Sequence, residues 1–419
     1  MDEPLTSAPE HYGRYRLVER IGVGGMAEVF KAYVEGREGF GDAFVIKRIR
    51  PEKADRAEII QMFCDEARIA ALLSHPNIVE TYDFGQIGGA YFMTMEYLRG
   101  RDLSAAMRAS RLRLAAVPPF VAARIAEQVA LGLEHAHRAT FADGRPAEII
   151  HRDVTPSNIM LLASGGVKVL DFGIAKVAAS ARVEAAVPRK RRIKGKLAYL
   201  SPEQVRNADL DARSDIFSLG VVLWEMLVGQ RLFAGGSEFE TLRNVLTLPV
   251  PPPSSKRPDV PPALDRVVAR ALERDRDARY ASAAALAREL GAALGQAPAG
   301  RDDVAALLTT LFGDDAARPR ERMTASLSGD SISSLEGEAS GRVTGEEPIA
   351  SDVAPTRAEG SRSAPEARGP PPARRHRALA VGAAAALLAA LALGVFWRRA
   401  FSPAAPDPSR PADTTSAGR

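Results

Sequence analysis

The stretch HRDVTPSN, at residues 151–158, decides the fold. Asp153 follows an arginine and lies five residues before Asn158, with a proline between them. A loop with this spacing offers one carboxylate that can accept a proton and one amide oxygen that can bind a metal ion. The apolar run that follows ends at Asp171, a second hard oxygen ligand of the kind that Mg²⁺ prefers. The sequence therefore predicts a proton-transfer and magnesium site here; two ordinary acidic loops are the alternative.

A glycine-rich hairpin and a lysine lie upstream of this loop. In RIGVGGMAEVFKAY, residues 20–33, Gly22 and Gly24 permit a tight turn whose amides can lie over phosphates. Ala27 stands where the G-x-G-x-x-G pattern has its third glycine. Lys47 ends the apolar run FVIK, and Glu66 lies in the helical pattern that follows. Because a buried ammonium needs a carboxylate partner to keep its proton, we predict a Lys47–Glu66 ion pair; taken singly, both residues are also typical of solvated surface charges.

Strand patterns come first along the chain, and helical patterns follow. Alternation of apolar and polar residues predicts a strand in YRLVERIG and, more loosely, in DAFVIKRI, and GGAYFMTMEYL is also typical of a strand. Helical spacing is found in AEIIQMFCDEARIAALLSH, PFVAARIAEQVALGLEHAH, SDIFSLGVVLWEML, PALDRVVARALERD and, at residues 302–315, DDVAALLTTLFGDD. We therefore expect a small strand-rich part followed by a larger helical part.

With all of these motifs in this order, residues 15–292 resemble the bacterial eukaryotic-like (Hanks-type) serine/threonine protein kinases. The resemblance implies an α+β fold with two lobes, in which ATP binds between a small β-rich N-lobe and a larger helical C-lobe. It also implies transfer of the γ-phosphoryl group of Mg-ATP to Ser or Thr of protein substrates. Asp153 would be the catalytic base, and Asn158 and Asp171 would bind Mg²⁺; Mn²⁺ is left open as a substitute.

The same resemblance assigns further residues. Lys47 would contact the α- and β-phosphates and pair with Glu66. Met95 corresponds to the gatekeeper, Glu96 to Leu98 to the hinge beside adenine, and Asp102 to a ribose contact. Glu203, in the motif SPE, would pair with Arg279, and Asp215 would stabilise the catalytic loop from a buried helix. The loop covering the nucleotide would consist of Ile21, Gly22, Val23, Gly24, Gly25, Met26, Ala27 and Val29.

The chain departs from the family pattern at two positions near the catalytic aspartate. Thr155 stands where the family usually has a lysine, and Lys196, in GKLAYLSPE, stands where it usually has a threonine. We hypothesise that Lys196 supplies the missing ammonium beside Asp153 and that Thr155 supplies the hydroxyl. The alternative is that Lys196 is a solvated loop lysine and the enzyme is slow.

Switching by phosphorylation of the activation segment is not favoured by the sequence. Arg152 is of the type that binds such a phosphate in the family, but Ser180 is the one hydroxyl residue between Asp171 and Gly195. The basic block PRKRRIKGK, residues 188–196, is either a docking site for an acidic partner or a solvated charge cluster. The linker hydroxyls are either autophosphorylation sites or simply typical of a disordered segment: Thr324, Ser326, Ser328, Ser331, Ser333 and Ser334.

Composition divides the chain into segments. We expect an N-terminal tail (1–14), the kinase domain (15–292), a helical extension (293–315), a disordered linker (316–377), a transmembrane helix (378–397) and a short extracytoplasmic tail (398–419). The run that begins with Ala378 and ends with Trp397 is uncharged and about 20 residues long, the length of a helix that spans a bilayer. An alanine-rich soluble helix is the alternative. Because ATP is cytosolic, we expect a single-pass protein of the cell inner membrane with the kinase domain in the cytoplasm.

Several function classes are disfavoured by composition. The net charge is only +4, which gives no argument for nucleic-acid binding, and the single cysteine excludes an internal disulfide framework. The expected partners are ATP, protein substrates and the membrane; dimerisation for autophosphorylation is left open. The rival functions are a membrane-tethered pseudokinase scaffold, for which Thr155 is the main support, and a small-molecule phosphotransferase of the same fold.

Overall fold

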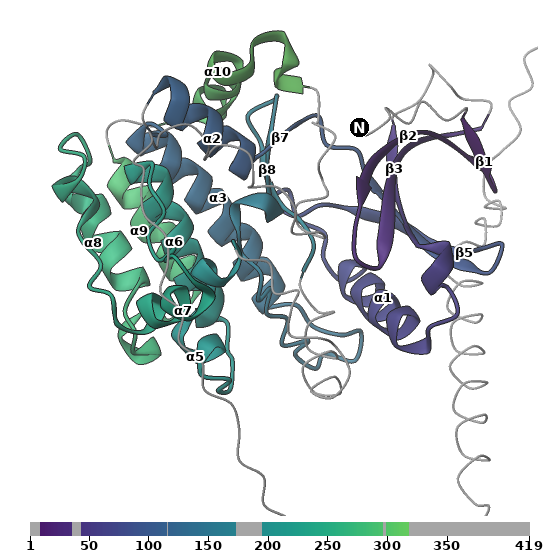
Figure 1. Cartoon of the computed structure of the whole chain (residues 1–419), viewed down its shortest axis with the longest axis horizontal. Coiled ribbons are helices and arrows are strands. Elements are labelled where there is room, and N and C mark those ends of the chain that lie inside the picture. Colours follow the sequence, from purple (N-terminus) through teal and green to yellow (C-terminus); the bar gives the residue numbers. More distant parts are fainter. Residues whose placement is uncertain (1–8, 36–42, 115, 173–194, 296–298, 318–419) are drawn as a thin grey trace, which may run out of the picture. The chain divides into compact units, whose positions relative to one another are not determined.

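The computed structural model describes residues 9–35, 43–114, 116–172, 195–295 and 299–317. These residues form two lobes, an N-lobe built on a β-sheet and a C-lobe built mainly of helices (Figure 1). The sheet has six antiparallel strands in the order β1-β2-β3-β4-β6-β5. Its strands are β1 (Glu10–Tyr12), β2 (Tyr15–Val23), β3 (Ala27–Val34), β4 (Phe44–Ile49), β5 (Thr81–Ile87) and β6 (Ala90–Glu96).

Apolar side chains of the N-lobe sheet are buried on both of its faces. One face carries Val29, Val45 and Met93, which pack with Phe63 of helix α1 (Ala57–Ala70). The other face carries a separate cluster that includes Leu17, Ile46 and Phe92. Because successive residues of a strand point to opposite faces, Val45 and Ile46 of β4 enter different clusters. The neighbouring Lys47 returns to the face covered by α1, where Glu66 is located.

The C-lobe core is formed around two long helices, α3 and α6. Helix α6 is buried along nearly its whole length because it is apolar on all sides, which is typical of a helix inside a lobe. The helices are α2 (Leu103–Arg113), α3 (Pro119–His137), α5 (Pro202–Val205), α6 (Arg213–Val228), α7 (Glu238–Thr247), α8 (Pro262–Ala271), α9 (Ala283–Leu294) and α10 (Arg301–Phe312).

A small antiparallel sheet connects the lobes and carries the motif that opened the sequence. Its strands are β7 (Gly100–Asp102), β8 (Ile159–Leu162) and β9 (Val167–Val169), in that order. The loop 151–158 leads directly into β8, and Asp171 follows β9. The sheet therefore brings both parts of the predicted site to one place.

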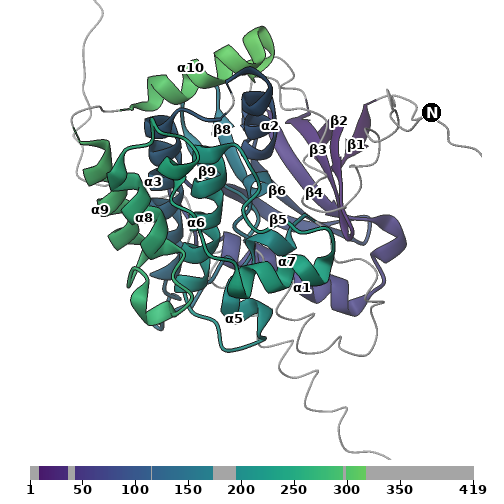
Figure 2. The same cartoon turned by 60° about the vertical axis from the view of Figure 1, so that its left-hand side comes forward.

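Helix α10 packs against α2 and β8, as the two views in Figures 1 and 2 agree. The buried side chain of Arg101 in β7 lies over the ring of Phe312 with a distance of 4.9 Å from Cζ to the ring centre. Its Nε and Nη2 donate to the carbonyl oxygen of Asp315 at 3.1 and 2.7 Å. The last described helix is thus joined to the strand that follows the hinge.

The strands and helices predicted from the sequence are present, but several elements were missed, among them β5, α7 and α9. Strand β1 lies within the expected N-terminal tail, where Glu10 pairs with Leu17 of β2. Helix α2 was not predicted, although Asp102 is a typical N-cap whose side chain accepts from the amide of Ala105. Helix α9 ends at Leu294, two residues beyond the expected domain limit.

The predicted membrane span lies outside the described residues. Among the residues that the structure does describe, no helix combines the length and apolar character needed to cross a membrane.

Candidate active site

The turn between β2 and β3 contains the loop predicted to cover the nucleotide. The amide of Gly24 donates to the carbonyl oxygen of Ala27 at 2.7 Å, which closes a tight turn. Ala27 is fully buried, so a small side chain fills the position of the third glycine. Gly22 pairs with Val29 across the hairpin. The turn therefore remains compact despite its departure from the glycine pattern.

Lys47 forms the predicted ion pair inside the N-lobe. Its Nζ lies 2.5 Å from Glu66 Oε1 and 3.2 Å from Asp171 Oδ1, and its side chain is only 3% exposed. Burial disfavours the ammonium, but the carboxylates of Asp171 and Glu66 outweigh this effect and raise the pKa of Lys47 above its usual range. Lys47 is therefore a fixed positive charge at the point where the two lobes meet.

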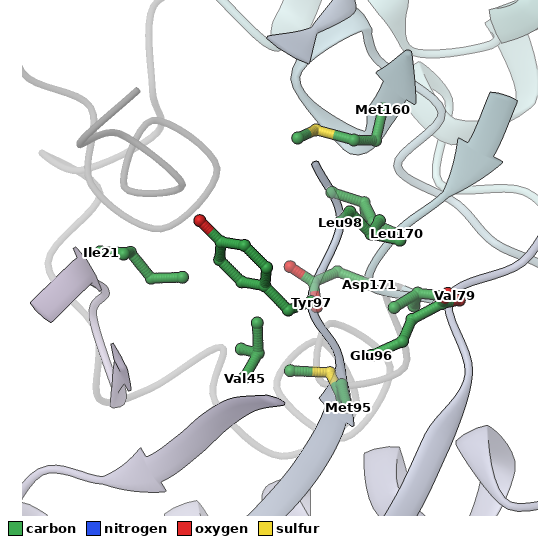
Figure 3. A pocket seen from close by; sticks show the side chains of 10 residues that line it. All are labelled: Ile21, Val45, Val79, Met95, Glu96, Tyr97, Leu98, Met160, Leu170 and Asp171. Atoms are coloured by element: carbon green, nitrogen blue, oxygen red, sulfur yellow. The ribbon is translucent and has the colours of Figure 1, made fainter. Parts of the chain in front are cut away.

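A largely apolar cleft lies beside Lys47 (Figure 3), and the space within it, open solvent included, is about 430 Å³. Figure 3 shows Ile21 and Val45 on the N-lobe side of the cleft and Met160 and Leu170 on the C-lobe side. The segment between the lobes completes it with Met95, Glu96, Tyr97 and Leu98, and Val79 and Asp171 also line it. The apolar walls suit a planar base, and the ammonium of Lys47, 3.2 Å from Asp171, is the charge suited to an anionic tail.

Met95 separates this cleft from a second cavity. Its side chain lines both spaces, and the second space is also lined by Glu66, Leu73 and Phe172. The gatekeeper role of Met95 stays a prediction. The carboxylate of Glu96 binds Lys168 of β9, and its Oε1 also accepts from the amide of Glu80 at 2.8 Å. Lys168 was not predicted as a partner of the hinge.

The catalytic loop is stabilised from below by Asp215 of α6. The two carboxylate oxygens of Asp215 accept from the amides of His151 and Arg152, each at 2.8 Å. Arg152 has a φ of 63°, a left-handed conformation that arginine seldom adopts without support. Burial opposes ionisation of Asp215, but His137, at 2.8 Å, and the loop outweigh it and lower its pKa. The predicted supporting role of Asp215 is confirmed.

Asp153 lies between an amide and an ammonium. Nδ2 of Asn158 donates to the backbone oxygen of Asp153 at 2.8 Å and to its Oδ2 at 3.1 Å. Lys196 Nζ lies 2.8 Å from the same Oδ2, and the side chains of Lys196 and Asp153 are 14% and 10% exposed. The structure thus brings the substituted lysine to the carboxylate that the sequence predicts as the catalytic base.

Thr155 is placed differently from the hypothesis. Its hydroxyl is buried and hydrogen-bonded to the hydroxyl of Ser157 at 3.0 Å rather than to Asp153. The structure therefore brings Lys196, but not the Thr155 hydroxyl, into contact with Asp153.

Asn158 and Asp171 are the side chains suited to a divalent ion. The amide of Leu170 donates to the carbonyl oxygen of Asn158 at 2.9 Å, so the strand end that carries Asp171 lies against the loop that carries Asn158. Since Nδ2 of Asn158 acts as a donor, its amide oxygen is the atom suited to a cation. No group of three or more His, Cys, Asp or Glu among the described residues could hold a metal. A site of two oxygen ligands completed by phosphates fits Mg²⁺.

Comparison with known proteins decides the family. Residues 15–290 match the model of the protein kinase domain. The chain belongs to the protein kinase family.

Two bacterial kinases illustrate the sequence similarity of this chain to its relatives. It is 38% identical over 335 residues to the tyrosine-protein kinase MasK of Myxococcus xanthus (strain DK1622), covering 77% of this chain and 51% of that protein. It is 34% identical over 273 residues to the serine/threonine-protein kinase PrkC of Bacillus subtilis (strain 168), covering 65% of this chain and 39% of that protein. The chain thus spans about half the length, or less, of these curated relatives.

A solved structure supports the two-lobed kinase fold. The crystal structure of the Mycobacterium tuberculosis PknI kinase domain matches with a TM-score of 0.50 and 26% sequence identity, covering 68% of this chain and 99% of that chain. Both the fold and the sequence therefore place this domain among bacterial kinases.

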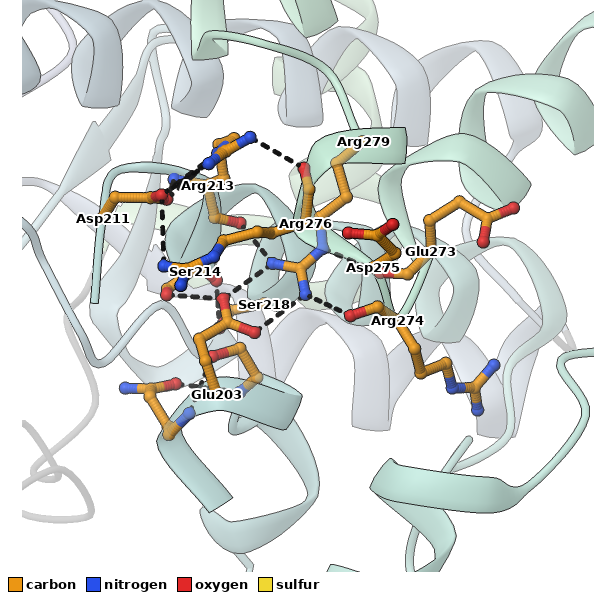
Figure 4. Close-up of polar contacts among 12 residues, drawn as sticks. Glu203, Asp211, Arg213, Ser214, Ser218, Glu273, Arg274, Asp275, Arg276 and Arg279 are labelled. Atoms are coloured by element: carbon orange, nitrogen blue, oxygen red, sulfur yellow. Dashed lines mark hydrogen bonds and ion pairs between the residues drawn. The ribbon is translucent and has the colours of Figure 1, made fainter. Parts of the chain in front are cut away.

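The end of the activation segment of this kinase is fixed by a buried ion pair (Figure 4). Arg279 Nη1 and Nη2 lie 2.7 and 2.8 Å from the two oxygens of Glu203, as predicted. The hydroxyl of Ser214 donates to Glu203 at 2.6 Å. Although burial opposes ionisation, Arg279 and Ser214 lower the pKa of Glu203 to about 2. This pair ties the segment to the C-lobe from residues 76 positions apart.

Some predicted and some unpredicted residues complete the description of this kinase site. Asp102 caps α2 with its Oδ1, and the ribose contact stays a prediction. Ser180, most of the basic block and the linker hydroxyls lie outside the described residues. Pocket residues that the sequence did not single out are Val45, Val79, Met160 and Leu170. Val45 could have been found, because it lies two positions from Lys47 on the same face of β4.

Proposed function

We propose that this chain is a protein serine/threonine kinase that transfers the γ-phosphoryl group of Mg-ATP to proteins. The observation that carries the proposal is the Lys47–Glu66 pair at 2.5 Å, with Asp171 3.2 Å from the same ammonium. A scaffold that had lost transfer activity would have no need to keep these three charged groups together, because burying a charged group costs free energy unless the group is paired.

The chain's own residues have complementary tasks. The cleft lined by Ile21, Val45 and Leu98 takes the adenine, and Lys47 binds the phosphates nearest to it. Asp153 accepts the proton of the attacking hydroxyl, while Lys196 places a positive charge beside it where negative charge gathers during transfer. A divalent ion bound to Asn158 and Asp171 would neutralise the phosphates. These residues position the reacting groups and neutralise the charge of the phosphates, and phosphoryl transfer requires little else from a protein.

A second candidate concerns the acceptor residue. One relative bears the name of a tyrosine-protein kinase and another the name of a serine/threonine-protein kinase. We propose Ser and Thr as acceptors because the motifs and the segment through Ser201–Glu203 resemble kinases of that type. Tyrosine transfer is the alternative outcome of the same experiment.

The test is label transfer from γ-labelled ATP by the full chain, purified with detergent, to itself and to a Ser/Thr-rich protein. An Asp171→Ala variant is the control, because it removes a metal ligand and leaves Asp153 in place. We expect label in the wild type alone, and acid hydrolysis should yield phosphoserine or phosphothreonine. Phosphotyrosine alone would favour the second candidate. Nucleotide binding without any label would favour the scaffold.

We also propose that residues 378–397 anchor the kinase in the cell inner membrane, with the domain in the cytoplasm where ATP is found. The support is the uncharged run of about 20 residues, which has the length of a bilayer span. Fractionation should place the full chain with membranes and a variant lacking residues 378–419 in the soluble fraction. Equal distribution of both proteins would contradict the anchor.

A further inference from the structure

Arg231 contacts the backbone directly next to Lys196. This arginine follows α6 in the chain, and its side chain is 35% exposed. Its Nη2 donates to the carbonyl oxygen of Gly195 at 2.8 Å. Because Gly195 directly precedes Lys196, this hydrogen bond fixes the chain on the N-terminal side of the lysine that reaches Asp153.

The guanidinium of Arg231 is itself oriented by two buried groups. Nη1 donates to the hydroxyl of Tyr199 at 2.5 Å and lies 3.4 Å from Glu225 Oε2, and Cζ lies 4.8 Å from the centre of the Tyr199 ring. Glu225 is fully buried; it accepts from the Tyr199 hydroxyl at 2.9 Å and from the amide of Leu232 at 3.1 Å. A planar guanidinium in such a setting has little rotational freedom left.

Among the residues that the structure describes, those on the C-terminal side of Lys196 secure it through local structure. The carbonyl oxygen of Lys196 accepts from the amide of Tyr199 at 3.1 Å in the 3₁₀ turn η4 (Leu197–Tyr199). The carbonyl oxygen of Tyr199 accepts from Ser218 of α6 at 2.8 Å. On the N-terminal side, Gly195 is exposed, and no atom lies within 4 Å of the place where a Cβ would be. A glycine with that much space has wide conformational freedom unless its carbonyl is held.

We propose that Arg231 is a positioning residue for phosphoryl transfer: by holding the carbonyl of Gly195 it keeps Lys196 in contact with Asp153. The inference rests on the proposed function for its effect on rate, but the positioning itself is a property of the chain. Arg231 touches neither Asp153 nor the nucleotide cleft, so its influence passes through Lys196.

A double-mutant cycle tests this path in the full chain. Arg231→Gln removes the charged fork, and we expect kcat to fall roughly tenfold while the dissociation constant of ATP is unchanged. In a Lys196→Thr background the same change should alter kcat less than about twofold, because the lysine it positions is gone. A fall of equal size in both backgrounds would overturn the proposal and leave Arg231 as a structural residue. Arg231→Lys, which keeps the positive charge and a donor group but loses the planar fork, should restore part of the rate.

Arg257→Gln is the matched control. Arg257 also donates to backbone carbonyls, those of Val117 at 2.7 Å and Leu227 at 3.1 Å, and pairs with Asp259. We expect this variant to have a lower unfolding temperature than the wild type and the same kcat.

A second measurement does not depend on activity. Reductive methylation followed by mass spectrometry reports how accessible Lys196 is, with the exposed Lys256 as internal reference. Release of Lys196 from Asp153 should raise its methylation severalfold in Arg231→Gln, or in Arg231→Lys to a lesser degree if the glutamine variant does not fold. Unchanged methylation would refute the proposal. A wild type that transfers no phosphate would refute the proposed function, whereas the methylation result would still decide the positioning.

Discussion

Replacement of Lys196 by Thr should slow phosphoryl transfer by roughly ten- to a hundredfold. The change removes an ammonium that lies 2.8 Å from Asp153 Oδ2, between side chains that are only 14% and 10% exposed. A hydrogen bond between charged groups shielded in this way contributes roughly 1.5–3 kcal/mol. If that interaction is made mainly while charge develops at the γ-phosphate, its loss appears in kcat. The expected variant is therefore slow but active.

The assay is the initial rate of labelled phosphate transfer at saturating ATP, beside a direct measurement of ATP binding. Lys256→Thr is the control, because Lys256 is exposed and distant in sequence from the motifs. The double variant Thr155→Lys, Lys196→Thr should transfer phosphate at least about tenfold faster than Lys196→Thr alone. For this recovery the side chain of the new lysine must extend from the buried position of Thr155, which is 3% exposed, towards Asp153. A Lys196→Thr variant with the wild-type rate would refute the reasoning.

Three further predictions follow from the fold. Met95→Ala should join the two cavities beside it, destabilise the domain by about 2–5 kcal/mol, and admit ATP analogues enlarged on the adenine, which competition binding would detect. Arg101→Gln should release α10 from the segment after the hinge, seen as faster amide hydrogen exchange in 301–312 than in the wild type. The Glu203–Arg279 pair should make the free energy of unfolding depend on pH in the acid range. Folding lowers the pKa of Glu203 from 4.5 to about 2, so its contribution to stability is complete above about pH 4.5 and is lost as the pH falls towards about 2. Unfolding temperatures of wild type and Glu203→Gln should therefore converge over that interval, and parallel curves would contradict the assignment.

Features carried by local pattern were predictable from the sequence. The strand ending in Lys47 and the helix carrying Glu66 each follow from apolar periodicity, and a buried ammonium demands a carboxylate. The loop 151–158 and Asp171 were found because their spacing is short and specific. The Glu203–Arg279 pair spans 76 residues, and only the resemblance to kinases linked its members.

Other contacts depend on three-dimensional placement that no local pattern encodes. Lys168 reaches the hinge residue Glu96 across 72 positions, and Arg231 reaches Gly195 across 36. An isolated lysine in a short strand or an arginine in a loop has no motif around it. The hydroxyl pair of Thr155 and Ser157 was missed for the opposite reason: a local partner two residues away competed successfully with Asp153.

The two lysines near the catalytic loop bear on the choice between enzyme and scaffold. A family lysine lost at position 155 would by itself suggest decay of the site. The structure instead places Lys196 Nζ 2.8 Å from Asp153 Oδ2, across 43 residues of sequence. If the site had lost its function, the side chain of Lys196 would be free to adopt any direction. Instead it contacts the carboxylate of Asp153, the predicted catalytic base. Because Arg231, oriented by Tyr199 and Glu225, binds the backbone carbonyl of Gly195 beside that lysine, the charge is supported by a second layer of contacts, which is what a working site requires.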